Sequence, residues 1–291
     1  MKKCNLWAML VIAFGVAGFT TSCSNESASA IASDASATTF TATASDESQA
    51  AIISDDVDNE VDNYVTVSAM NSYSAVKSLY QTADATGPII TINRPDSTNF
   101  PKVITIDYGT TGFVGKRGNI LKGKVIVVVS DKMNEVGSSR TITFDNFSRN
   151  GNGVTGIKVC TYKGLTANVH PTWSISVKDT ITLVDGTKVI WNAERVRERI
   201  GDDGTPLIYG DDVYSISGTS SGVNAKGVAY TSVIDANNPL IIGDGWPYFT
   251  KGTVTITSDV KTIVIDYGNG ARDKTATATV NGVTKTFTMK N

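Results

Sequence analysis

The feature that most constrains the fold is a hydrophobic period of two that begins after residue 87. Apolar residues alternate with Thr, Ser or Lys, for example in Val103–Tyr108 and Trp173–Val177, as they do in antiparallel strands with one buried face. Asp185-Gly186 and Asn281-Gly282 lie between β-prone runs and predict two-residue hairpin turns. We therefore expect an all-β body, an antiparallel β-sandwich or meander, over residues 87–291. The other alternating runs are Ile89–Ile92, Thr141–Phe144, Val213–Ile216 and Val254–Ile256.

An eight-residue segment occurs twice, as Lys102–Gly109 and as Lys261–Gly268, and both copies end in Ile-Asp-Tyr-Gly. Because the copies bracket the body, they predict two related β units, near 88–130 and 252–291, and not a short-period solenoid. Because side chains alternate between the two faces of a strand, three equivalent positions of the two copies fall on one face: Ile104/Ile263, Ile106/Ile265 and Tyr108/Tyr267. The equivalent aspartates Asp107 and Asp266 fall on the other face.

Two further features belong to these units. Val125–Val129 is apolar at every position, which predicts a strand covered on both faces. Gly123 and Gly282 are equivalent in the alignment of the two copies, which predicts equivalent turns before this run and before Val283–Met289.

The N-terminal residues have the order of a secretory signal. Lys2 and Lys3 precede an apolar run, Leu6–Phe19, which is shorter than the roughly 20 residues of a transmembrane helix. The following Thr-Thr-Ser-Cys resembles the loose lipobox of Bacteroidota lipoproteins and implies cleavage of a signal peptide, residues 1–22, with acylation of Cys23. The alternative is an ordinary signal peptide in which Cys23 is coincidental. Two or more acyl chains would hold the protein durably on a membrane.

The three cysteines agree with this interpretation. Cys4 would leave with the signal peptide and Cys23 would carry lipid, so Cys160 would have no partner for an intramolecular disulfide. The body must then be stable through its own core.

Residues 23–86 hold ten acidic side chains and one basic residue, Lys77, whereas residues 87–291 hold 18 acidic and 23 basic ones. The Ser/Ala/Thr-rich stretch Ser24–Ala44 predicts a flexible tether. Apolar residues at helical spacing between Asp46 and Tyr64 predict one short amphipathic helix. We expect its acidic face (Asp55, Asp58 and Asp62) to be solvated.

A mildly basic body is compatible with anionic glycans, or with the acidic segment of the same chain. The density of Lys and Arg is too low to predict nucleic-acid binding.

No motif for a catalytic residue, a cofactor or a metal is present, and His170 is the only histidine. Asp107 and Asp266 are the repeated carboxylates, which could serve glycoside hydrolysis but more often bond to turn amides. The acidic loop Asp202–Asp212 offers hard oxygen ligands for Ca²⁺, although its spacing matches no calcium loop and favours a solvated loop.

Two groups of residues are candidates for contact with a ligand. Arg195, Arg197 and Arg199 fall on one face of a predicted strand, where they could bind an acidic partner or pair with carboxylates of neighbouring strands. Trp246-Pro247-Tyr248-Phe249 could stack on sugar rings or bury a loop against the sheet. Of these residues, Trp246, Tyr248, Arg195 and Arg197 are the predicted contacts.

The chain resembles a group of uncharacterised Bacteroidota lipoproteins that share the Ile-Asp-Tyr-Gly repeat near both ends. The resemblance continues in Thr143–Phe147, Trp191–Arg195 and Tyr214–Gly218 and covers most of residues 87–291. It implies a lipid-anchored all-β protein and carries no activity.

These observations favour a non-enzymatic lipoprotein of the cell outer membrane, periplasmic or surface-exposed, with a binding or structural role. Its partners would be the membrane, through the lipid, and a surface protein or glycan. One alternative is a fimbrillin-like surface assembly subunit, although no arginine lies between Cys23 and Arg94 for the Arg-specific maturation of that group. The other alternative is a carboxylate-dependent hydrolase.

Overall fold

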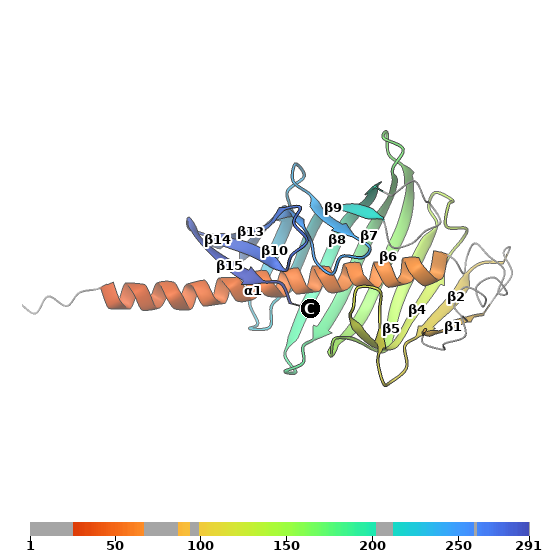
Figure 1. Ribbon diagram of the computed structural model, residues 1–291, viewed down its shortest axis with the longest axis horizontal. Helices are drawn as coiled ribbons and strands as arrows, with labels where there is room; N and C mark the ends of the chain where they lie inside the picture. The colour runs from red at the N-terminus through yellow and green to blue at the C-terminus, as the bar shows by residue number, and fades with distance from the viewer. Residues whose placement is uncertain (1–25, 67–86, 94–98, 202–211, 259–260, 291) are drawn as a thin grey trace, which may run out of the picture. The chain divides into compact units, whose positions relative to one another are not determined.

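The computed structural model describes residues 26–66, 87–93, 99–201, 212–258 and 261–290. The chain divides into two compact units, residues 1–36 and 37–291. The second unit contains most of helix α1 (Glu26–Val61), a short π-helix (Asp62–Thr66) and all the strands (Figure 1).

Within the described residues, fifteen strands form one antiparallel sheet, which confirms the predicted all-β body. Their order along the sheet nearly follows the sequence, as in a meander; β11 pairs with β9 and β12, and β3 pairs with β4. The strands are β1 Ile89–Ile92, β2 Lys102–Asp107, β3 Phe113–Val114, β4 Ile120–Val129, β5 Ser139–Arg149, β6 Asn152–Leu165, β7 Pro171–Thr182, β8 Lys188–Gly201, β9 Val213–Val223, β10 Ala229–Ile234, β11 Leu240–Gly243, β12 Lys251–Ser258, β13 Lys261–Asn269, β14 Thr275–Val280 and β15 Val283–Thr288.

Burial alternates along the strands as the hydrophobic period of two predicts. Every second residue of β2 and of β10 is buried. In Val125–Val129 three residues are buried and the two between them are partly buried, so the outer face of this apolar run is only partly covered. β-branched side chains suit such half-buried, pleated surfaces.

The two predicted hairpin turns both occur, but they differ in length. Asn281 and Gly282 both have positive φ and join β14 to β15 as a two-residue loop, as predicted. Between β7 and β8 only Gly186 has positive φ, and the amide of Leu183 donates to the carbonyl of Thr187. This loop is therefore longer than the predicted two residues.

Both copies of the repeat form strands, β2 and β13, near opposite ends of the strand order. The predicted facing is confirmed, because the isoleucines and tyrosines of both copies are buried while Asp107 and Asp266 face outward. The predicted equivalence of Gly123 and Gly282 is wrong. Gly123 lies at an irregularity within β4, whereas Gly282 lies in the β14–β15 hairpin, so the two units pair their strands differently.

The helix differs from its prediction in length. It begins at Glu26, so the segment expected to be a flexible tether, Ser24–Ala44, is helical from that residue. Alanine, the best helix former, recurs through this segment and offsets the weaker propensity of its Ser and Thr residues.

The helix also differs from its prediction in how deeply it is buried. From Thr43 to Val65 every residue except Asp62 is buried, including the polar ones. A helix with one solvated face would not show this pattern, so the curved sheet surrounds the helix within the second unit. In Figure 1 this part of α1 runs across the strands.

The helix contacts the inner face of the sheet through apolar side chains and through ion pairs. Ile52, Ile53, Val57 and Val61 are all at most 3% exposed. Between them, buried carboxylates meet cations that point inward from the strands and from the loop before β4. These ion pairs include Asp55–Arg117 at 2.8 Å, Asp56–Arg149 at 2.7 Å, Asp58–Lys158 at 2.5 Å and Glu47–Arg195 at 3.2 Å. The partly buried Asp62 pairs with Arg197 at 2.6 Å and with Arg140.

The electrostatics of this interior follow from burial opposed by the basic side chains. Burial raises the pKa of Asp55 and Asp62, but the arginines outweigh it and hold both below their usual value. At Asp58 burial outweighs Lys158 and raises the pKa. The acidic face that was expected to be solvated is thus the ionic core of the body, where each charge depends on its partner.

Candidate functional site

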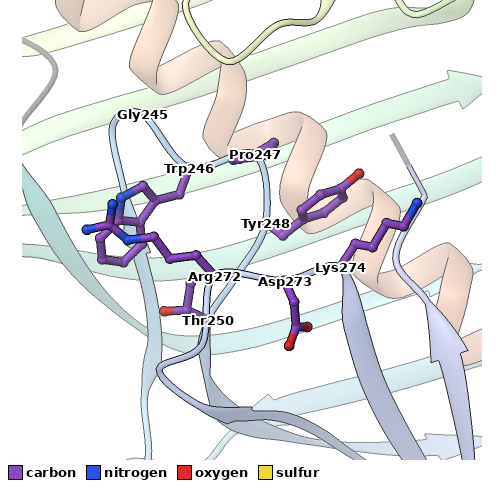
Figure 2. A pocket seen from close by; sticks show the side chains of 8 residues that line it. All are labelled: Gly245, Trp246, Pro247, Tyr248, Thr250, Arg272, Asp273 and Lys274. Carbon is purple, nitrogen blue, oxygen red and sulfur yellow. The ribbon is translucent and has the colours of Figure 1, made fainter.

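Two loops of the second unit line an open cavity of about 470 Å³. One loop follows β11 and the other joins β13 to β14, directly after the second Ile-Asp-Tyr-Gly segment. A cavity of this size suits a small-molecule site. Figure 2 shows its lining: Gly245, Trp246, Pro247, Tyr248, Thr250, Arg272, Asp273 and Lys274.

Trp246 is held on one wall of the cavity by its own backbone. Its amide donates to the carbonyl of Gly243 at 3.0 Å, which folds the chain back over that glycine. A Cβ at Gly243 would lie 2.7 Å from Cδ2 and Cε2 of the indole, so a side chain at this position would displace the ring. The guanidinium carbon of Arg272 lies 4.0 Å from the indole centroid, a close cation–π contact.

The base of the aromatic loop is fixed from the interior of the body. Arg117 donates from Nε to the carbonyl of Asp244 at 2.8 Å and from Nη2 to the carbonyl of Gly243 at 3.1 Å. Asn59 of the helix donates to Oδ1 of Asp244 at 2.7 Å. Burial, opposed in part by Arg197, raises the pKa of Asp244 to about 6. The helix and the loop before β4 therefore position the cavity wall.

Tyr248 and Lys274 lie across the cavity from Trp246 and Arg272 (Figure 2). Burial raises the pKa of Tyr248, so its hydroxyl stays protonated at neutral pH. Phe249 points the other way: it is 1% exposed and packs edge-on against Tyr267, with centroids 5.3 Å apart. The aromatic run thus contributes both to the cavity and to the core.

The acidic residue of the second loop, Asp273, is hydrogen-bonded within its own loop. Asp273 accepts hydrogen bonds from the amide of Thr275 at 2.7 Å and from its hydroxyl at 2.6 Å. These bonds lower the pKa of Asp273 and turn its carboxylate away from the cavity (Figure 2). Among the residues that the structure describes, neither Arg272 nor Lys274 forms an ion pair.

The other predicted ligand contacts, Arg195 and Arg197, lie elsewhere. Both point into the body, 7% and 2% exposed, where they pair with carboxylates of the helix. Arg197 also stacks on Tyr214, with its guanidinium carbon 3.4 Å from the ring centroid. Of the two roles considered for the arginine stripe, Arg195 and Arg197 take carboxylate pairing, but their partners lie on the helix and not on neighbouring strands. Arg199 lies 3.6 Å from Asp212.

The repeated carboxylates take the turn-bonding role. Asp107 accepts from the amide of Gly109 at 2.9 Å, and Asp266 accepts from the amide of Gly268 at 2.8 Å. Asp107 also lies 3.3 Å from Lys124. The two carboxylates belong to strands near opposite ends of the sheet order, and no contact joins them.

The remaining candidates do not form a second site. His170 lies 2.8 Å from Glu198 on a part-buried surface. The acidic loop falls outside the described residues except for Asp212, which accepts from Tyr214 at 3.0 Å. No group of three or more metal-ligating side chains occurs within the described ranges.

Two buried carboxylates have strongly raised pKa values without a catalytic partner. Burial and the neighbouring Asp56 raise the pKa of Glu60 to about 7, and Glu60 accepts from Tyr108 at 3.1 Å. Burial raises the pKa of Asp179 to about 7 as well. Neither residue lines the cavity between the two loops.

Cys23 and the preceding signal segment lie outside the described residues. Within the part of the chain that is described, no helix is long and apolar enough to cross a membrane. No protein-family model matches this chain, and no match was found among curated proteins or among solved structures.

The sequence pointed to Trp246 and Tyr248 but missed Arg272 and Lys274. The signal that could have found them is their place in the turn-rich stretch that follows the second repeat, where a loop must leave the sheet. The sequence could not show that this loop meets the aromatic one, since the β12–β13 hairpin separates them.

Proposed function

We propose that this chain is a lipid-anchored protein of the outer membrane, periplasmic or surface-exposed, whose all-β body binds a partner without catalysing a reaction. The anchor rests on the order of basic residues, a short apolar run and Ser-Cys at the N-terminus. The binding role rests on one observation: the cavity between Trp246 and Tyr248 presents two cations without acidic partners among the described residues.

The geometry favours binding over hydrolysis. The repeated carboxylates Asp107 and Asp266 are already bonded to turn amides, and the interior carboxylates with raised pKa are packed against the sheet. Inverting and retaining glycosidases need two carboxyl groups facing one substrate, about 5 to 9.5 Å apart. The cavity lining contains one aspartate, Asp273, and no second carboxylate among the described residues faces it there.

The anchor is tested by replacing the sulfur that would carry the lipid. Cys23→Ser should abolish palmitate labelling and release the protein from the membrane fraction. Cys4→Ser is the matched control, because it removes a thiol that would be discarded with the signal peptide. Unchanged labelling and fractionation of Cys23→Ser would refute the anchor.

The binding role is tested by crosslinking on intact cells followed by capture of the acylated protein. The expected result is a partner that is captured by the native chain and lost from the Trp246→Leu variant, with equal amounts of both proteins on the membrane. Hydrolysis of any member of a broad glycan or peptide panel by the purified protein would contradict the non-catalytic role.

A further inference from the structure

We infer that the cavity between the two loops binds an acidic saccharide, a sugar ring that carries a carboxylate. This inference names the ligand class of the site and rests on the proposed binding function. It is carried by the placement of Arg272, Lys274, Tyr248 and Pro247 around one cavity.

Arg272 supplies an oriented site for the carboxylate. Its guanidinium is stacked on the indole of Trp246, and the indole is packed against Gly243. Stacking fixes the plane of the guanidinium while leaving its edge N–H groups for an anion. A carboxylate matches that edge, because two parallel N–H···O bonds can form.

Lys274 adds a second positive charge from the same loop, on the side of Tyr248 (Figure 2). The intervening Asp273 supplies one negative charge against the two positive charges of Arg272 and Lys274, and its Oδ1 accepts hydrogen bonds from Thr275. The cavity is thus positive although an acidic residue lines it. An anionic ligand is favoured over a neutral or cationic one.

Tyr248 and Pro247 form the apolar part of the lining, and the Tyr248 hydroxyl is a protonated donor. Sugar rings present apolar C–H groups beside hydroxyls, so they fit a wall with one aromatic face and one polar tip. A volume of about 470 Å³ accommodates a ring and part of its neighbour.

The site is also built in advance of any ligand. Arg117 and Asn59 fix Gly243 and Asp244 from the interior, and Gly243 fixes the indole on which Arg272 lies. Binding to such a wall costs little ordering of the protein.

The test is isothermal titration calorimetry of the purified full chain with tetragalacturonate. Its methyl ester is the matched neutral probe, and glucose 6-phosphate is the arm that separates carboxylate from phosphate. We expect binding of tetragalacturonate, weakening with salt, and no heat from the methyl ester. Equal binding of the methyl ester, or binding of the sugar phosphate alone, would overturn the inference.

Variants assign the binding to this cavity. Arg272→Gln and Lys274→Gln should each weaken tetragalacturonate binding about 10- to 100-fold. Lys188→Gln, an exposed lysine of β8, removes the same charge elsewhere and should leave the affinity unchanged. Tyr248→Phe should keep most of the affinity, and Tyr248→Leu should lose it. Affinities of the Arg272 and Lys274 variants equal to that of the native chain would refute the assignment.

The experiments distinguish a wrong ligand class from a wrong binding role or a wrong anchor. If tetragalacturonate does not bind but the crosslinked partner is still lost from Trp246→Leu, the ligand class is wrong and the binding role stands. If tetragalacturonate binds while Cys23→Ser stays acylated, the site stands and the anchor falls.

Discussion

The ionic core makes a sharp prediction for Arg197. This side chain is 2% exposed and lies 2.6 Å from Asp62 and 3.5 Å from Asp55. Arg197→Met keeps much of the volume and removes the charge, so the buried Asp55 and the partly buried Asp62 lose a partner while Arg117 and Arg140 still compensate them in part. Breaking a buried pair in this way costs about 3–5 kcal/mol of unfolding free energy.

The assay is urea denaturation followed by tryptophan fluorescence, with the midpoint and slope compared between variants. Lys188→Met is the matched control on the same strand, and it should change the unfolding free energy by less than about 0.5 kcal/mol because that side chain is exposed. The double variant Arg197→Met/Asp62→Asn should be more stable than the sum of its single changes by about 1 kcal/mol or more. A cost for Arg197→Met no larger than that of Lys188→Met would refute the account of an acidic helix held by inward cations.

Three further predictions concern single groups. Burial raises the pKa of Glu60 from 4.5 to about 7 in the folded state, so the stability that the protonated carboxyl contributes is present below pH 4.5 and is lost as the pH rises to about 7. The unfolding free energy of Glu60→Gln, measured by urea titration, should therefore rise by about 2–3 kcal/mol relative to that of the native chain between pH 4.5 and 7.5. Unfolding free energies of the two proteins that change equally with pH would contradict this. Gly243→Ala should displace the indole and shift the tryptophan emission, while Gly153→Ala, whose Cβ would meet Thr182 at an ordinary 3.8 Å, should not. Asp266→Ala removes the bond to the Gly268 amide and should lower the unfolding free energy of the native chain by about 1 kcal/mol in urea titrations; Asp235→Ala, which removes a comparable turn bond to Asn237, should have an effect of the same size.

The sequence predicted the parts of this molecule that are governed by local periodicity. Alternation in segments such as Val103–Tyr108 predicts a strand and its buried face, because side chains of a strand point to opposite sides in turn. The repeat predicted which side chains of β2 and β13 point inward, and Asn281-Gly282 predicted its turn from the positive φ that such loops require.

Long-range pairing explains what the sequence could not show. Acidic residues on a helix are usually solvated, and arginines on a strand usually face water. Asp55 and Arg197 break both expectations because each is buried beside opposite charges, including each other at 3.5 Å, although they lie 142 positions apart in the sequence. Neither pattern alone contains that contact.

In the candidate site, too, a local motif indicated some residues, whereas others are brought in by long-range strand pairing. The aromatic run made Trp246 and Tyr248 candidates for ligand contact, but Arg272 and Lys274 reach the same cavity through the register of β12 with β13. That register depends on backbone pairing over the whole hairpin and not on any motif within the loops.

The most direct test of where this protein acts is the intact mass of the mature chain purified from cell membranes. The account predicts a polypeptide that begins at Cys23 and carries the added mass of acyl chains on that residue. A mature chain that begins at any other residue, or an unmodified Cys23, would contradict it.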